Sequence, residues 1–207
     1  MFYNILDEER LDILPLLKIF KKDFYLAGGT ALALQLGHRD SVDFDFFSKN
    51  DIDTEKLFRE LENIFTDYKI QKIQEEKNTL TIIAGENVKI SFFTYEYPLL
   101  KPLIEEQYLN LASVEDIASM KLSAIVSRST EKDYIDLYFI LKDCYLDSLL
   151  ELAREKFPSL DKNLILKSLV YFDDITEEAI MFKNDKNVSL EKVKEFLVEE
   201  SEKYLKG

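Results

Sequence analysis

The stretch FYLAGGTALALQLGHRDSVDFDFFS, residues 24–48, decides the fold of this chain. In it an apolar run leads into Gly28-Gly29, a short helical segment follows, and Asp43 and Asp45 lie within a second apolar run. Side chains of a strand alternate between its two faces, so the two aspartates point to the same side. Carboxylates are the hard oxygen ligands that Mg²⁺ or Mn²⁺ takes, and a glycine turn opening a helix presents backbone N–H groups to phosphates. The stretch therefore predicts a site for a metal ion and a triphosphate.

Taken separately, the two halves of this pattern carry less weight. A Gly-Gly pair is typical of an ordinary turn that needs positive φ. Aspartate is uncommon in strands, and two carboxylates on one face repel each other unless a cation or solvent relieves them. Their occurrence together, in the order strand, glycine turn, helix and strand, is what favours a functional site.

Composition narrows the class of protein. With 207 residues, 46% of them apolar, and with 15 Phe and 11 Tyr, the chain is long enough to bury a core. The single cysteine, Cys144, excludes an internal disulfide and fits a reducing cytoplasm, and one His with one Cys argues against a zinc site. The apolar runs are too short for a bilayer, and the first ten residues carry acids where a signal peptide carries bases. We therefore expect a cytoplasmic protein with no membrane partner.

The charge balance limits the partners. The chain has 27 basic and 40 acidic residues, a net charge of −13. Neutralising phosphates takes clustered Lys and Arg, so this balance argues against a protein whose main task is to coat nucleic acid. It leaves room for a local basic patch and for a basic protein partner.

Hydrophobic spacing and turn signals predict the order of elements. Strands are expected at 24–27, 42–47, 80–84 and 88–95, and helices at 4–22 with an interruption at Pro15, 30–36, 54–65, 113–127, 131–142, 147–156, 161–170, 174–182 and 189–205. Pro98 and Pro102 punctuate the chain, and everything after them is expected to be helical. The fold class is therefore α/β (α+β), with a mixed α/β half at residues 1–100 and an all-helical half at residues 101–207.

At this point the chain resembles a known family. The spacing GG-x13-DxD resembles the signature of the polymerase-β-like nucleotidyltransferase superfamily. The fuller string GGTALALQLGHRDSVDFDFF is similar to that of the AbiEii/AbiGii-type nucleotidyltransferase toxins of bacterial toxin–antitoxin and abortive-infection systems. Residues 116–141, DIASMKLSAIVSRSTEKDYIDLYFIL, resemble the later motif of the same family. The resemblance implies a nucleotidyltransferase-type mixed sheet with flanking helices, followed by a C-terminal helical bundle.

The second motif also has a local interpretation. Lys121 and Arg128 are seven residues apart and share one helical face, and Asp133 and Asp136 share a face of the next helix. Alone, this pattern is typical of a solvated ladder of salt bridges between adjacent helices. The resemblance implies instead that Lys121 contacts the triphosphate and that Asp133 positions or assists the site. Asp136 either joins the site or has a structural role, capping a helix or pairing with Arg128.

Other polar residues around the first motif are candidates for the nucleotide. Arg39 either holds a phosphate or pairs with the nearby carboxylates, whereas His38 is more typical of a packing or capping residue. The resemblance adds Thr30, at the helix start, as a phosphate contact. The expected catalytic residues are Asp43, Asp45, Lys121 and Asp133, with Asp43 and Asp45 as metal ligands, and the expected nucleotide-binding residues are Gly28, Gly29, Thr30, Arg39 and Arg128.

One position departs from the superfamily pattern. A third carboxylate often stands on a later strand and faces the Asp pair, but the position we align with it is Ser91. A hydroxyl does not replace the charge of a carboxylate. Either Asp133 takes over the role of the base, or activity is weak or absent.

The resemblance implies a metal-dependent nucleotidyltransferase that moves a nucleotide from an NTP to an acceptor hydroxyl. The expected acceptor is an RNA such as a tRNA end, with a protein hydroxyl as the other possibility, and the expected setting is a toxin with an antitoxin partner. A second hypothesis is a catalytically silent nucleotide-binding module whose helical half binds a partner. A third is a stable α/β domain whose motifs are coincidental, which predicts no binding of a magnesium–nucleotide complex.

Overall fold

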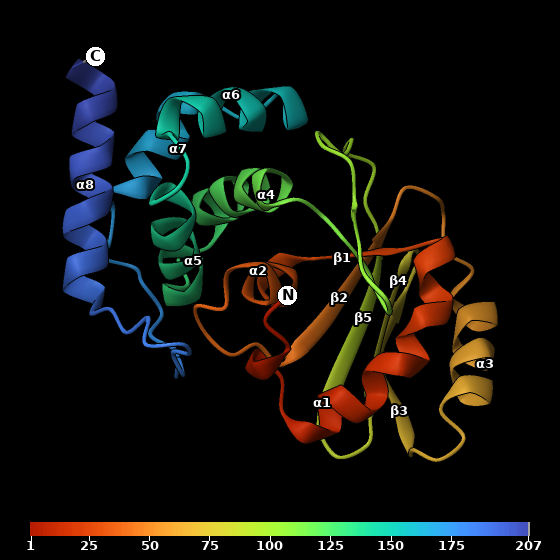
Figure 1. Ribbon diagram of the computed structural model, residues 1–207. Coiled ribbons are helices and arrows are strands. Elements are labelled where there is room, and N and C mark those ends of the chain that lie inside the picture. The colour runs from red at the N-terminus through yellow and green to blue at the C-terminus, as the bar shows by residue number, and fades with distance from the viewer. Residues whose placement is uncertain (207) are drawn as a thin grey trace.

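The computed structural model describes residues 1–206, and in it a seven-stranded mixed sheet has the order β3-β4-β5-β2-β1-β7-β6 (Figure 1). The strands are β1 (Tyr25–Ala27), β2 (Asp43–Ser48), β3 (Ile70–Glu76), β4 (Thr79–Ala84), β5 (Val88–Thr94), β6 (Ile104–Glu105) and β7 (Asn110–Leu111). Strand β2 pairs antiparallel with β1 and parallel with β5, so the central strand of the first motif lies between two partners.

Helices lie on both sides of this sheet. They are the 3-10 helices η1 (Tyr3–Ile5) and η2 (Leu14–Lys22), and the α-helices α1 (Glu8–Ile13), α2 (Gly28–Leu36), α3 (Thr54–Ile64), α4 (Val114–Ser127), α5 (Glu131–Leu141), α6 (Leu146–Lys156), α7 (Lys162–Leu169) and α8 (Leu190–Lys206). Helices α4 to α8 gather beside the sheet, and α2 packs against β1, β2, α4 and α5 (Figure 1). Among the helices of residues 1–206, none combines the length and apolar composition that crossing a bilayer requires.

The two faces of β2 differ in burial, as the alternation of its side chains predicts. Phe44 and Phe46 are buried on one face, where Phe46 stacks on Phe92 of β5 at 5.2 Å between ring centroids. Phe20 of η2 covers this pair, with its ring 5.0 Å from that of Phe92. The other face, which carries the two aspartates, stays partly exposed and shares a cavity with residues of α4 and α5.

The α/β fold class predicted from the sequence is confirmed, and so are most of its elements. The interruption at Pro15 is also confirmed, because α1 ends at Ile13 and a 3-10 helix continues from Leu14. Strand β3 was not predicted, since its outward side chains are mostly polar and hide the strand pattern. The expectation that everything after Pro102 is helical is wrong, because β6 and β7 extend the sheet there.

The predicted helix at 174–182 is wrong, and residues 172–183, here named the strap, contain no helix. The backbone of the strap has one internal turn bond, from Ile175 N to Phe172 O, and otherwise bonds to two distant loops. Thr176 N donates to Ser129 O at 2.8 Å, and Glu131 N donates back to Thr176 O at 3.1 Å. Further along, Asp40 N donates to Met181 O at 2.9 Å. The strap thus ties the loop before α5 to the loop before β2.

A buried ion pair fixes the passage from the sheet to the helical group. Lys156 of α6 donates to Asp116 of α4 at 2.7 Å and to the carbonyl oxygen of Pro98 at 2.6 Å. Asp116 also accepts the N–H groups of Leu100 and Lys101. The division into units at residues 1–100 and 101–207 stays a prediction, and β7 pairs with β1 beyond that boundary.

Candidate active site

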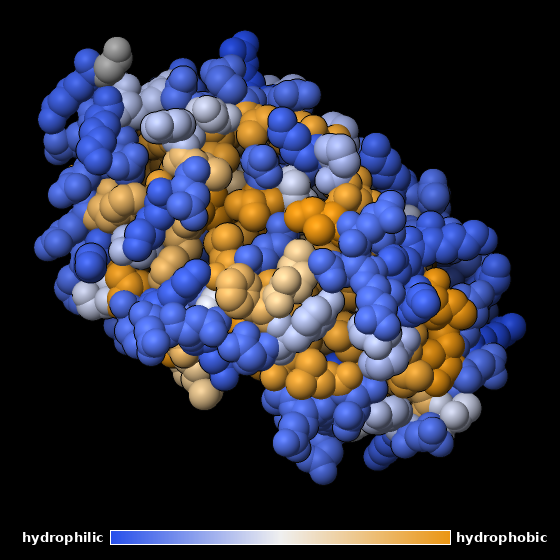
Figure 2. All heavy atoms as spheres, in the orientation of Figure 1, coloured by the Kyte–Doolittle hydropathy of each residue, from blue (hydrophilic) through white to orange (hydrophobic). Residues whose placement is uncertain are grey.

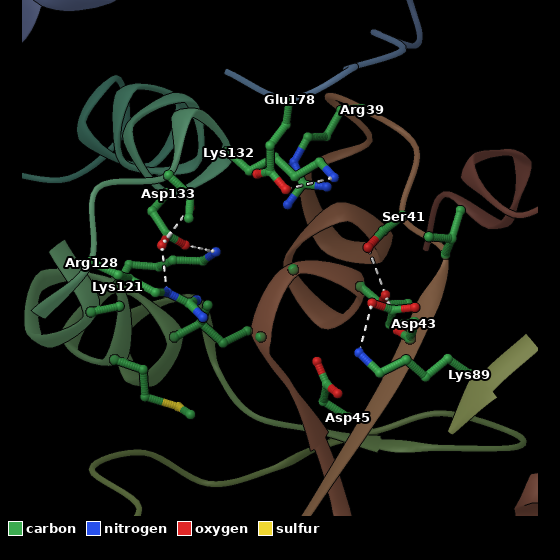
Figure 3. Close-up of a pocket in the computed structure, with 18 of the residues that line it drawn as sticks. Arg39, Ser41, Asp43, Asp45, Lys89, Lys121, Arg128, Lys132, Asp133 and Glu178 are labelled. Carbon is green, nitrogen blue, oxygen red and sulfur yellow. Dashed lines mark hydrogen bonds and ion pairs between the residues drawn. The ribbon is translucent and has the colours of Figure 1, made fainter. Parts of the chain in front are cut away.

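A cavity of about 740 Å³ lies between the exposed face of β2 and β5 and the helices α4 and α5 (Figure 3). The N-terminus of α2 and the strap complete its walls. Figure 3 shows Asp43, Asp45 and Lys89 on the sheet side, facing Lys121, Arg128 and Asp133 on the helical side. All nine residues predicted for the site line this one cavity: Gly28, Gly29, Thr30, Arg39, Asp43, Asp45, Lys121, Arg128 and Asp133.

Glycine is required at positions 28 and 29 for different reasons. Gly28 has φ +73°, a left-handed conformation that side chains other than glycine rarely adopt. A Cβ at Gly28 would lie 3.5 Å from Asp45 Oδ2, which shows how close the turn comes to the carboxylate. A Cβ at Gly29 would lie 2.7 Å from Arg39 Nη2, closer than atoms approach. The pair therefore lets the start of α2 come up against both a carboxylate and a guanidinium.

The side chain of Thr30 connects α2 to β2. Its hydroxyl donates to the backbone carbonyl of Asp43 and lies 2.7 Å from the hydroxyl of Ser41. Because its proton is used within the protein, Thr30 has a positioning contact that the sequence did not reveal. Its predicted contact with phosphate stays a prediction. Within residues 1–206, no side chain caps the N-terminus of α2, so its first N–H groups are available to a ligand.

The two aspartates differ in their surroundings. Asp43 is 42% exposed and its Oδ2 lies 3.4 Å from Nζ of Lys89, the residue opposite it on β5. Asp45 is less exposed, and burial followed by the charge of Asp43 raises its pKa, while Lys89 and a hydrogen bond from Ser91 act in the opposite direction. The negative charges of Asp43 and Asp45 are therefore only partly offset by neighbouring cations of the protein.

This donor set fits a divalent cation. Mg²⁺ is bound in such sites by one or two carboxylates, with substrate phosphates and water completing its octahedron. Within residues 1–206, no group of three His, Cys, Asp or Glu side chains is arranged to hold a metal. An ion bound by Asp43 and Asp45 would therefore depend on the phosphates of a substrate for its remaining ligands.

Ser91 stands where the alignment placed it. It is the partner of Asp45 on β5 and is almost fully buried. Strand β5 thus presents Lys89 and the hydroxyl of Ser91 to the Asp pair, and no carboxylate.

The helical wall of the cavity is an ion-pair network. Nζ of Lys121 lies 2.6 Å from Asp133 Oδ1 and 2.7 Å from Asp136 Oδ2, and all three side chains are buried. Arg128 donates from Nε to Asp133 at 3.0 Å, although it follows the last residue of α4 and has extended backbone. The salt bridges expected between these adjacent helices are present, but the expectation that they are solvated is wrong for the acids, which are buried.

Asp136 belongs to this network through other partners than expected. It accepts hydrogen bonds from His38 Nε2 at 2.8 Å and from Arg39, through Nε at 2.8 Å and Nη2 at 2.9 Å. The structural pairing of Asp136 with Arg128 is therefore wrong, since Arg128 contacts Asp133. Arg39 pairs with a carboxylate, as one alternative held, but that carboxylate is Asp136 and not the Asp43–Asp45 pair.

The surroundings of Asp133 do not suit a base. Burial pushes its pKa up, but Lys121, Arg128 and a hydrogen bond from Thr130 outweigh burial, and the pKa lies below its ordinary value. Its two oxygens accept from these three side chains. These contacts support the positioning role predicted for Asp133, because they hold two cations against the cavity. Of the three N–H donors of Lys121, two face the acids.

Some lining residues were not predicted. Lys89 and the aromatic residues Phe47, Phe93 and Tyr95 lie on the same sheet face as the aspartates, and the alternation of β2 and β5 could have revealed them. Lys132 and Glu178, whose Nζ and Oε1 are 3.5 Å apart, close the cavity from the strap side. Nothing local in the sequence places the strap there.

The chain is similar to several known proteins. The family model for the nucleotidyl transferase AbiEii toxin of type IV toxin–antitoxin systems matches residues 16–204. A protein of Aquifex aeolicus (strain VF5) described as uncharacterized is 37% identical over 191 residues, which cover 89% of both chains. Among solved structures, JHP933 from Helicobacter pylori has a TM-score of 0.60 at 19% identity, covering 97% of this chain and 94% of that one. MenT4, a nucleotidyltransferase toxin from Mycobacterium tuberculosis H37Rv, has a TM-score of 0.60 at 15% identity, covering 94% and 85%.

The fold and the family model define a nucleotidyltransferase. The diglycine at the head of α2 and the two strand carboxylates are the parts of the cavity that fit this class. The chain belongs to the AbiEii family of nucleotidyltransferase toxins.

Proposed function

We propose that this toxin is metal-dependent and transfers a nucleotide from an NTP to a hydroxyl of an RNA, under the control of an antitoxin protein. One observation carries the proposal. Asp43 and Asp45 project from one strand face into a cavity, beside a diglycine where a Cβ at Gly28 would lie 3.5 Å from Asp45 Oδ2. Family membership supports the toxin and its antitoxin in general terms, and the net charge of −13 leaves room for a basic partner.

The residues of the cavity have separate roles in such a transfer. The acceptor oxygen forms a bond to the α-phosphorus as the bond to pyrophosphate breaks, and the hydroxyl proton leaves to water. Backbone N–H groups at the start of α2 bind the outer phosphates, and Lys121 with Arg128 offsets charge on the departing pyrophosphate. Mg²⁺ or Mn²⁺ on Asp43 and Asp45 would neutralise phosphate oxygens and align the two reacting oxygens when bound.

Ser91 limits the reaction but does not exclude it. Phosphoryl groups react through a loose transition state in which the attacking oxygen has formed little bond. Early removal of its proton therefore contributes less than charge neutralisation and alignment. We expect a slow enzyme, with rate set by the positioning residues more than by a base.

The test is an assay with labelled NTPs, Mg²⁺ and total RNA. We expect label in the RNA, and Asp45→Asn should reduce its rate about a hundredfold to a thousandfold, the effect typical of one lost electrostatic contact. Folding should be unaffected, because the change removes one of two repelling charges. Asp12→Asn, on the exposed surface of α1, is the matched control and should label RNA at the wild-type rate.

Ser91 is the observation that favours the second candidate, a silent nucleotide-binding module. That candidate predicts that NTP and Mg²⁺ raise the melting temperature while no RNA or protein is labelled. Labelling of protein instead of RNA would contradict the proposed acceptor. If NTP and Mg²⁺ cause neither stabilisation nor labelling, the motifs are coincidental.

A further inference from the structure

Three aromatic side chains continue the row of acidic residues along the sheet. On β2 the residues of the exposed face are Asp43, Asp45 and Phe47, and their partners on β5 are Lys89, Ser91 and Phe93. Tyr95 follows two residues after Phe93, and its N–H donates to Ser48 O at 2.7 Å, which continues the pairing of the strands. We name Phe47, Phe93 and Tyr95 the aromatic shelf, and all three line the cavity.

The rings of the aromatic shelf pack against one another and are only half-buried. The ring of Phe47 lies 5.4 Å from that of Phe93 and 5.3 Å from that of Tyr95, with Tyr25 of β1 stacked on it at 6.0 Å. Phe47 also packs against the hydrophobic core, but the fully buried aromatic residues of these strands, Phe44, Phe46 and Phe92, lie on the other face. Large apolar side chains held open to a cavity are more typical of a binding surface than of a core.

The place of the shelf follows from the strand register. Ala27 of β1 pairs with Asp45, and Tyr25 pairs with Phe47. The diglycine follows Ala27, so it lies toward the Asp43 end of β2, and the aromatic shelf lies on the other side of Asp45. Along the strand the order is therefore diglycine, carboxylates and shelf.

In-line transfer assigns a ligand to each of these places. The attacking and departing oxygens stand on opposite sides of the α-phosphorus. If the outer phosphates lie at the diglycine and the α-phosphate at the carboxylates, pyrophosphate leaves toward α2 and the acceptor approaches from the shelf. This step rests on the proposed function, because it takes the diglycine as the phosphate site.

We propose that the aromatic shelf stacks an unpaired base of the acceptor, so that the substrate is single-stranded RNA. Proteins bind single strands by stacking bases on aromatic side chains, an interaction that tolerates any base because each has a π-face. A base inside a duplex keeps its faces against its neighbours and offers none to the shelf. A protein hydroxyl would need no such platform beside it.

The test measures binding without turnover. The probe is a short single-stranded RNA whose terminal base is 2-aminopurine, which loses fluorescence on stacking, added to the full chain with Mg²⁺. We expect quenching on binding, and Phe47→Leu or Phe93→Leu should weaken binding about fivefold to a hundredfold, the range for one lost base stack. A blunt duplex of the same sequence should not compete.

Controls separate stacking from folding. Tyr95→Phe keeps the ring and should bind the probe as the wild type does, while Phe58→Leu changes a half-buried aromatic residue on α3, outside the cavity. Melting temperatures of all variants show whether leucine has disturbed the sheet. Equal weakening by Phe58→Leu would mean that loss of stability, and not loss of stacking, explains the result.

Kinetics show whether the aromatic shelf stacks a base of the acceptor RNA or the base of the NTP. The proposal expects the shelf variants to raise KM for RNA and to leave KM for the NTP unchanged. A raised KM for the NTP with an unchanged KM for RNA would overturn the proposal and show that the shelf stacks the base of the NTP. Quenching of the probe does not require nucleotide transfer, so the two proposals can fail separately. A wild-type protein that binds the probe but transfers no nucleotide would contradict the proposed function alone. An active wild-type protein whose shelf variants bind the probe normally would contradict this inference alone.

Discussion

Asp136 shows how single residues hold this cavity in shape. Its carboxylate is fully buried and accepts from His38, Arg39 and Lys121, which come from the loop before β2 and from α4. Burial raises its pKa, but Lys121, Arg39 and the bond from His38 prevail, and the pKa lies well below the ordinary value. A buried charge is tolerated when it is paired and hydrogen-bonded in this way. Arg39 and Lys121 are therefore held in place before any ligand binds.

His38 allows a direct check of this network. Burial lowers its pKa, despite the opposing effect of Asp136. Nε2 donates to the carboxylate, whereas Nδ1 has no partner within residues 1–206. A proton on Nδ1 would thus create a buried donor without an acceptor. Since His38 is the only histidine in the sequence, one imidazole signal in an NMR titration reports its pKa, which we expect below 6.5.

The lowered pKa of His38 predicts how the stability of the fold depends on pH. The folded pKa is depressed, so below pH 6.5 the unfolded chain binds the proton more readily than the folded chain. The free energy of unfolding should therefore fall as pH decreases through about 6.5. Urea unfolding at about pH 7.5 and about pH 5.5 should show a smaller decrease for His38→Gln than for the wild type. A signal that titrates above 6.5 would contradict both expectations.

At the scale of elements, Lys156 and Asp116 secure the passage between the sheet and the helical group. Both side chains are inaccessible to solvent. Lys156→Met would leave Asp116 buried without its cation, and breaking such a pair costs about 3–5 kcal/mol. Lys203→Met is the control, because Lys203 is 66% exposed in its pair with Glu200, where a salt bridge contributes about 0–1 kcal/mol. Urea unfolding measures both, and equal losses would contradict the prediction.

The elements differ in how far the sequence predicts them. Strand β2 was predictable because Phe44 and Phe46 alternate with Asp43 and Asp45, and alternation is a local signal. The strap was not predictable, because its apolar spacing imitates a helix while its backbone bonds to loops more than 40 residues away in the sequence. Likewise the pairing of Lys121 and Asp133 could be proposed from spacing, but the bond from Arg39 to Asp136 depends on how α2 packs against α5.

At the scale of the whole molecule, the cavity differs from the rest of the surface. The chain carries a net charge of −13, and polar residues cover most of the face in Figure 2 around a band of apolar surface. The cavity lining balances its charges, with Arg39, Lys89, Lys121, Arg128 and Lys132 against Asp40, Asp43, Asp45, Asp133 and Glu178. The cavity lining therefore lacks the excess of negative charge that the chain as a whole carries.

This distribution predicts a weak dependence of RNA binding on salt. Of the cavity's cations, Lys89, Lys132 and Arg128 have side chains 41%, 32% and 62% exposed, and the other two are buried with acids. If single-stranded RNA contacts these three, log K should fall with log salt with a slope of about −2, at about −0.7 per contact. Binding of the fluorescent RNA at several salt concentrations measures the slope. A slope steeper than about −4 would place the main contacts outside the cavity.

The strap has a consequence for how the toxin receives its ligands. Because its carbonyl and amide groups bond to Ser129 and Glu131 at one end and to His38 and Asp40 at the other, spreading the two walls would break several backbone bonds at once. A cavity held in this way loses little conformational entropy when a ligand binds. The shape of the cavity therefore selects the ligand, and little binding free energy is lost in ordering the protein.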